Sequence, residues 1–358
     1  MTALRRPASS AGLDSTDPAA PTAAPASPLG LASRLAPLAA ERHASARELV
    51  LLTAREVREW VLAWPETCDP RELGRELERG LGEWERDQAW RGPCAAFLDT
   101  LRATWHAHRA HADFQGLLAE ELGLWLWSTE DEVVAHGEHA EPWNGEPLAR
   151  GRRLPLRREA ARHAAATVGK GETILATGWS ETLALALEQA WRAGKRPRLF
   201  MGDSLPFLDA RRMARRLVRE GVLVTIVYDA VLPALVERAD RVWAPAEGIG
   251  ASEFSARAGT RHLLETARAR EVPVELVTTS DKLLPCGELR LPTWCARMPE
   301  LLWRDAIEGV TLELDCFEAV PLALTPEPIT ENGRESVAGL ALRAMRASAE
   351  PVCAALES

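Results

Sequence analysis

The first part of the chain shows the spacing of apolar residues that is typical of amphipathic helices. Between about residues 31 and 166, apolar residues recur three and four positions apart, as in "ARELVLLTAREVREWVLAW" and "FLDTLRATWHAH". Pro65 and Pro70 interrupt the first long helix, and the Gly, Pro and Asn residues of "HGEHAEPWNGEP" predict a longer loop near residues 136–147. We therefore predict a helical N-terminal domain over residues 31–166.

The pattern changes after residue 152, where short β-rich runs alternate with helical spacing. The runs are "ETILAT", "PRLFMG", "VLVTIVY", "DRVWAP" and "VPVELVTT", and the helical segments begin near Ser180, Pro206, Ala230 and Ser255. Five strands, beginning near residues 172, 197, 222, 240 and 272 and interleaved with these helical segments, predict a parallel sheet. Nearly every residue of these runs is apolar, which is typical of strands covered by helices on both faces. A "VTLELD" strand and a helix over residues 336–348 are expected to complete an α/β domain over residues 167–358.

Length and composition agree with two globular domains. A chain of 358 residues is long enough for two domains of ordinary size. With 46% hydrophobic and 27% charged residues, it contains no run of about 18 apolar residues, so no membrane span is predicted. The net charge of −9 argues against nucleic-acid binding, which depends on clustered Lys and Arg. We expect a small-molecule ligand or a protein partner instead.

The cysteines and the first residues favour a cytoplasmic protein. Six cysteines without a CxxC pair, in a chain of this size, predict buried free thiols in a reducing cytosol. Residues 1–30 are rich in Ala, Pro, Ser and Thr and lack the apolar core of a secretory signal, so we predict a disordered tail. His106 and His108 would point to different faces of a helix, and we predict no metal and no cofactor.

Polar residues follow the carboxyl ends of the predicted strands, where an open parallel sheet binds its ligands. In chain order they are Thr177, Gly178, Trp179, Ser180, Glu181, Asp203, Ser204, Asp209, Asp229, Glu247, Gly248, Glu253, Arg257, Thr278, Thr279, Ser280 and Lys282. Helix capping is the alternative role for Ser180 and Asp229, since each precedes an apolar periodic run. Because several strand ends supply carboxylates, we predict a polar, acid-lined pocket.

Several of these segments carry a resemblance. They are the "ILATG" strand, the Gly194–Lys195 step, "GVLVTIVYDA" with Asp229, the "AEG" turn at residues 246–248, the "AGT" triplet at residues 258–260 and "FEAVPLALTPEPITENG". This pattern resembles the family of initiation factor 2B alpha, beta and delta subunits and of methylthioribose-1-phosphate isomerase. The resemblance implies a Rossmann-like sheet domain after a helical N-terminal domain, and association into a homodimer or a larger homo-oligomer through the sheet domain.

The sequence departs from the isomerases of this family at the positions that carry their chemistry. Gly178 stands where the resemblance places a catalytic Cys, and Glu247 stands where it places a catalytic Asp. The "AEG" spelling resembles the alpha subunit of initiation factor 2B more than the isomerases. Proton transfer by Glu247 together with Asp229 or Asp203 is the isomerase chemistry that these residues still allow.

The residues that hold the substrate phosphate in the isomerases also differ. Their Arg-Pro-Arg run corresponds to residues 205–207 (Leu-Pro-Phe), their Gln corresponds to Asp209, and their Asn-Lys pair corresponds to Ala256 and Arg257. Arg91, in "WRGPCAA", is only loosely similar to a phosphate-binding Arg of the family. Losing donors and gaining a negative charge disfavours the family's usual way of binding a phosphate dianion.

Our leading hypothesis is therefore a regulatory or ligand-sensing protein, without isomerase chemistry, that binds a sugar phosphate or a nucleotide at the strand ends. The predicted ligand-binding residues are Gly178, Trp179, Ser180, Glu181, Asp203, Ser204, Asp209, Glu253, Arg257 and Lys282. The alternative is a sugar or sugar-phosphate isomerase that uses Glu247 and Asp229. A dedicated translation factor is disfavoured, because the Ala- and Arg-rich, Lys-poor composition suggests a GC-rich genome. In a bacterium, the factor role that the resemblance implies would lack its usual partner. An exposed Trp patch on the helical domain would offer a site for a protein partner.

Overall fold

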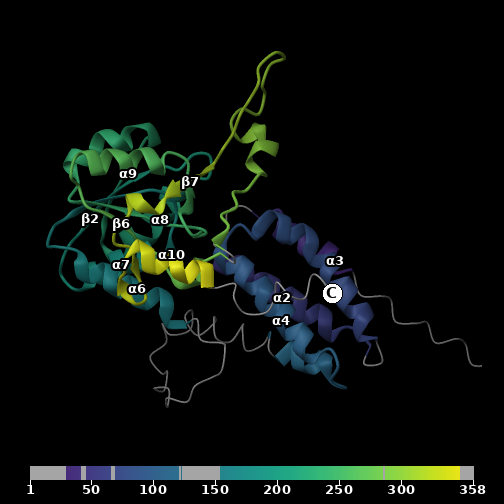
Figure 1. Ribbon diagram of the computed structural model, residues 1–358. Coiled ribbons are helices and arrows are strands. Elements are labelled where there is room, and N and C mark those ends of the chain that lie inside the picture. Colours follow the sequence, from purple (N-terminus) through teal and green to yellow (C-terminus); the bar gives the residue numbers. More distant parts are fainter. Residues whose placement is uncertain are drawn as a thin grey trace, which may run out of the picture.

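The computed structural model describes residues 30–41, 46–65, 69–120, 122, 154–284 and 287–346. The loop predicted near residues 136–147 and residues 1–29 of the predicted tail lie outside these ranges. Figure 1 shows a helical part, coloured purple to blue, beside a sheet domain coloured teal to yellow. This arrangement confirms the predicted fold class. No helix among the described residues is both long and apolar enough to cross a membrane.

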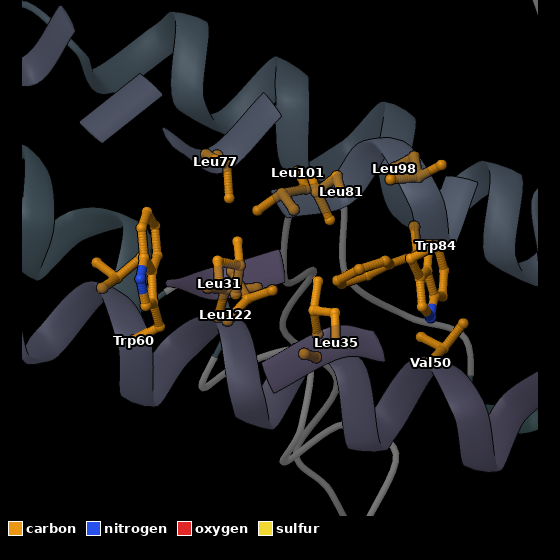
Figure 2. Close-up of a cluster of buried hydrophobic side chains, with 14 of the residues drawn as sticks. Leu31, Leu35, Val50, Trp60, Leu77, Leu81, Trp84, Leu98, Leu101 and Leu122 are labelled. Carbon is orange, nitrogen blue, oxygen red and sulfur yellow. The ribbon is translucent and has the colours of Figure 1, made fainter. Parts of the chain in front are cut away.

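The N-terminal part is built from helices: α1 (Leu31–Ala39), α2 (Ala46–Leu62), α3 (Pro70–Gln88) and α4 (Gly92–His108), and residues 114–120 are helical as well. The Asp69 carboxylate caps α3 by accepting the Arg71 backbone N–H at 2.9 Å, and Pro70 occupies the first turn, where no N–H is needed. Apolar side chains at helical spacing meet in one core around Trp60 and Trp84 (Figure 2). Both indole side chains are fully buried.

Five parallel strands form the central sheet: β1 (Thr173–Ala176), β2 (Arg198–Gly202), β3 (Leu223–Val227), β4 (Arg241–Ala244) and β6 (Val274–Leu276), in the order β3-β2-β1-β4-β6. All five strands predicted from the sequence are present. One face packs on α6 (Leu154–Thr167), α7 (Glu181–Arg192) and α8 (Asp209–Leu217). The other packs on η2 (Asp229–Arg238), α9 (Thr260–Ala269) and α10 (Val337–Arg346). Helix α6, predicted within the helical domain, thus packs with the sheet domain.

Two local predictions were wrong. The helix expected near Ser255 is a strand, β5 (Glu253–Arg257), which pairs antiparallel with β7 (Phe317–Pro321), and α9 begins only after Gly259, whose φ is +90°. Pairing with a strand distant in the sequence outweighed local helical spacing. The "VTLELD" segment pairs with no strand among the described residues, and its place is taken by β7. The helical segment expected near Ala230 is present as the 3₁₀ helix η2, which contains Pro233.

The strand β3 forms one edge of the sheet and is largely exposed, although helices were expected to cover every strand on both faces. It pairs only with β2, and Leu223 is 59% exposed. The connections beside it are the short 3₁₀ helices η1 (Val218–Glu220) and η2, which leave both faces of the strand partly uncovered. This edge is thus an apolar surface of the sheet domain.

Gly92 joins the helical part to the sheet domain. Its backbone N–H donates to the Glu247 carbonyl at 2.9 Å, and its Cα lies against the backbone of Lys282 in the 3₁₀ helix η3 (Ser280–Lys282). A Cβ at this position would overlap that backbone. Only glycine therefore fits here without moving the two parts apart.

We predict that Gly92→Ala lowers the free energy of unfolding by about 1–3 kcal/mol, because the added methyl group overpacks the junction. Urea unfolding followed by circular dichroism measures the change. The matched control is Gly82→Ala in α3, where an added Cβ meets nothing within 4 Å and should stabilise the helix by about 0.5–1 kcal/mol. Equal effects of the two substitutions would contradict the tight junction.

Candidate functional site

The loop after β1 packs against the residue at the end of β5. Gly178 has a φ of +67°, and a Cβ there would lie 3.0 Å from the Arg257 side chain. Ser180 caps α7, since its hydroxyl accepts the Leu183 backbone N–H at 3.3 Å. The capping role proposed for Ser180 is thus present. Gly178, which the resemblance aligns with the catalytic Cys of the isomerases, faces the side chain of Arg257.

The carboxylates after β2 and β3 are occupied by local contacts. Both oxygens of Asp229 accept backbone N–H groups, from Ser204 at 2.9 Å and from Leu205 at 3.1 Å. These bonds hold Ser204 in a left-handed conformation with a φ of +59°. Asp203 pairs with Arg211 at 2.8 Å. Asp229 therefore shapes the turn after β2.

Asp229 and Glu247 do not lie side by side. They follow β3 and β4, and the strand order places β2 and β1 between these two strands. Three interstrand steps separate their strand ends by roughly 14 Å. This spacing is too long for the two carboxylates to act directly on one pair of neighbouring carbon atoms.

Arg257 is held from three sides. Its guanidinium pairs with Asp209 at 2.6 Å, and it stacks on the rings of Phe207 and Phe317 at 4.3 and 4.4 Å from the ring centroids. Trp90 and Trp294 complete an aromatic cluster around Phe317. The cation that the resemblance aligns with a phosphate-binding lysine is thus an internal bridge between β5, α8 and β7.

Glu247 lies at the junction with the helical part. Its side chain is half-buried, and its charge acts on Lys282 and on Cys94 of α4. The Lys282 ammonium donates to the Ala246 carbonyl, and burial lowers the pKa of Lys282. Burial also raises the pKa of the Cys94 thiol to about 12. Cys94, which the strand-end analysis did not select, is therefore neither exposed nor ionised near neutral pH.

Two further predicted residues lie away from these contacts. Glu181 pairs with Arg157 of α6 at 2.8 Å. Glu253 begins β5, opposite Pro321 of β7. No group of three or more His, Cys, Asp or Glu side chains suited to a metal occurs among the described residues.

Trp179 lies against Arg212 in an arginine-rich surface on α8. The Arg212 guanidinium lies 4.5 Å from the Trp179 ring centroid, and its Nη2 donates to both carboxylate oxygens of Glu48 of α2, at 2.9 Å each. The Trp179 indole N–H is buried and finds no acceptor among the described residues, and the same holds for Nη1 of Arg257. Two donors at this end of the sheet are thus without an acceptor there.

Beside this surface lies a cavity of about 310 Å³. Its lining residues are Phe207, Leu208, Asp209, Arg211, Arg212 and Arg215. The three arginines come from α8, directly after the loop that follows β2. Our sequence analysis missed them, although the "DARRMARRL" run places them where strand-end ligands bind. Guanidinium groups at a helix start are suited to phosphate oxygens.

Comparison with known proteins bears on this site. Residues 151–291 match the Initiation factor 2 subunit family. Methylthioribose-1-phosphate isomerase of Pelotomaculum thermopropionicum is 29% identical over 170 residues, which are 44% of this chain and 46% of that protein. The isomerase of Alkalilimnicola ehrlichii is 29% identical over 169 residues, with 44% and 49% covered. The chain thus spans about half the length of the curated relatives it matches.

Solved structures share the fold over more of the chain. The 5-methylthioribose 1-phosphate isomerase of Pyrococcus horikoshii OT3 superposes with a TM-score of 0.64 at 14% identity, covering 89% of this chain and 88% of that one. The translation initiation factor eIF-2B of the same organism gives 0.61 at 18% identity, covering 86% and 97%. The resemblance predicted from the sequence is confirmed, since residues 151–291 match the Initiation factor 2 subunit family and the fold is shared with both of these solved structures.

Proposed function

We propose that this protein is a regulatory member of its family that binds a phosphorylated metabolite, a sugar phosphate or a nucleotide, and does not isomerise it. The observation that carries the proposal is the state of Arg257, which Asp209 neutralises and two phenylalanine rings enclose. A phosphate would have to break this pair to reach the cation. Arg215 of α8, an exposed arginine in the neighbouring cavity, needs no such change.

The residues left for isomerase chemistry support the same view. Gly178 offers no thiol, and Asp229 gives both oxygens to backbone N–H groups. The Glu247 charge acts on Lys282, whose ammonium is buried against a backbone carbonyl. Aldose–ketose isomerisation needs a base and an acid that both reach the substrate. In this arrangement Glu247 would act without such a partner.

The cavity on α8 suggests how binding would be sensed. Arg212 already holds the Glu48 carboxylate of the helical part, and both side chains are substantially exposed, at 37% and 50%. A phosphate dianion in the cavity would compete with Glu48 for this guanidinium. Binding would then loosen a contact between α2 and α8 and carry the signal to the helical part.

Two further properties belong to this proposal. We place the protein in the cytoplasm, in agreement with the buried free thiols of Cys94, Cys295 and Cys316. We also propose that it forms a homo-oligomer. A structural neighbour is described as the tetrameric eIF2B-beta2-delta2 complex of C. thermophilum, with a TM-score of 0.59 at 13% identity.

Ligand binding is tested by thermal shift with sugar phosphates, nucleoside monophosphates and free pentoses. A phosphorylated ligand at about one hundred times its Kd should stabilise the protein by about 2.7 kcal/mol, and free pentoses should give no shift. Arg215→Glu should abolish the shift, because it reverses the charge of an exposed arginine in the cavity. Arg75→Glu, on the exposed side of α3, is the matched control.

The same ligand is then incubated with the protein, and aldose and ketose forms are followed by NMR. We expect binding without conversion. Conversion that is lost in Glu247→Gln would establish the isomerase alternative. A shift that persists in Arg215→Glu would place the ligand elsewhere, and no shift with any phosphorylated compound would contradict ligand sensing.

The structural role of Lys282 predicts a pH dependence. Its pKa is lower in the folded chain than the ordinary value of 10.5, so between these two values the unfolded chain binds more protons. The free energy of unfolding should therefore rise as the pH increases toward 10.5, and Lys282→Met should remove this rise. Urea unfolding at about pH 8 and about pH 10 measures it. Lys170→Met, at an exposed lysine, is the control, and equal slopes in wild type and Lys282→Met would contradict the prediction.

A further inference from the structure

Between η3 and β7 the chain leaves the sheet domain as a projecting arm, residues 287–316 (yellow-green in Figure 1). The base of the arm is firmly held. Trp294 is 2% exposed and packs edge-on against Phe207, with ring centroids 5.7 Å apart. At the two ends of the arm, Cys295 and Cys316 share a thiol hydrogen bond, which, with burial, raises the pKa of Cys316. The arm is therefore anchored in the aromatic cluster.

The tip of the arm, residues 302–311, is exposed at every position. Four of its exposed side chains are large and apolar: Leu302 (57%), Trp303 (43%), Ile307 (64%) and Val310 (44%). Apolar side chains gathered on a projection remain in water at a cost that another surface would relieve. The tip does not fold back on its own domain, since all of its residues are exposed.

The charge around the tip is negative. Residues 300–315 contain five acidic side chains and one basic side chain, which gives a net charge of −4. Asp305 and Glu308 lie within the exposed tip, and neither forms an ion pair among the described residues. A surface that covers the tip should therefore combine apolar side chains with positive charge.

The same chain carries such a surface at the edge of its sheet. The edge surface consists of exposed apolar side chains from η1, β3 and η2: Val218 (59%), Leu223 (59%), Ile226 (40%), Tyr228 (66%) and Val231 (43%). Arg198 and Arg219 flank it, and neither forms an ion pair among the described residues. The free side of β3 also presents backbone groups without a strand partner there.

We propose that the tip of the arm docks on the edge surface of a second copy of this chain. A two-fold dimer then forms the contact twice, with each copy giving one tip and receiving one. Apolar side chains on both surfaces leave water, and the acidic tip meets Arg198 and Arg219 of the other copy. The inference rests on the homo-oligomer of the proposed function and names its contact surfaces; it needs no ligand.

The test uses the full chain in size-exclusion chromatography with light scattering over a range of concentrations. The tip swap Asp305→Arg/Glu308→Arg and the edge swap Arg198→Glu/Arg219→Glu should each raise the dimer Kd at least tenfold, because each sets like charges against one another. An equimolar mixture of the two variants should form a heterodimer in which both contacts again pair opposite charges, and one chain carrying both swaps should restore the homodimer. Ile307→Asp, which places a charge in the apolar contact, should raise the Kd about a hundredfold.

Glu83→Arg, at an exposed acid of α3 far from the arm in sequence, is the matched control and should leave the Kd unchanged. Circular dichroism confirms that each variant is folded. A wild-type monomer would overturn both the docking and the homo-oligomer. A dimer that survives the swaps and Ile307→Asp would overturn the docking alone, and a combined swap that stays monomeric would show that the edge is not the partner of the tip.

Discussion

The ion pair between Arg257 and Asp209 joins four segments that are far apart in the chain. Arg257 ends β5, Asp209 begins α8, and the rings of Phe207 and Phe317 lie against the guanidinium. A desolvated cation–π contact contributes about 2 kcal/mol, and a charge-assisted bond at 2.6 Å offsets part of the cost of removing both charges from water. Breaking either partner would leave a largely buried charge uncompensated. The arrangement thus fixes the small β5–β7 sheet against α8.

The Arg257–Asp209 pair also determines which cations at the strand ends are accessible to a ligand. Because Arg257 is paired with Asp209, the accessible positive charge at this end of the sheet belongs to α8. There Arg215 is exposed and Arg212 pairs with Glu48. Ion pairs between exposed side chains contribute at most about 1 kcal/mol, so the Arg212–Glu48 pair is weak compared with a bidentate phosphate contact. The Arg257–Asp209 pair is therefore structural. The weaker Arg212–Glu48 pair lies at the contact between α8 and α2.

The sequence was sufficient for the parts of the fold that local pattern determines. Five apolar runs between helical segments identified all five strands of the sheet, and "AEG" with "AGT" identified the family. The sequence did not predict the secondary structure of segments that form by pairing with residues distant in the chain. Residues 253–257 have no strong strand pattern and become β5 only because β7 lies beside them. The exposure of β3 could not be seen either, since a strand's apolar residues do not reveal whether a helix covers it.

The same limit applies to the candidate site. Asp209 and Arg257 were both selected as strand-end residues, but their pairing and the aromatic rings around them depend on residues 207, 209, 257 and 317 meeting in space. Once paired, these residues are better at holding the fold than at holding a ligand. The aromatic cluster that encloses Arg257 also anchors the base of the arm through Trp294. One set of contacts therefore occupies Arg257 and holds the base of the arm.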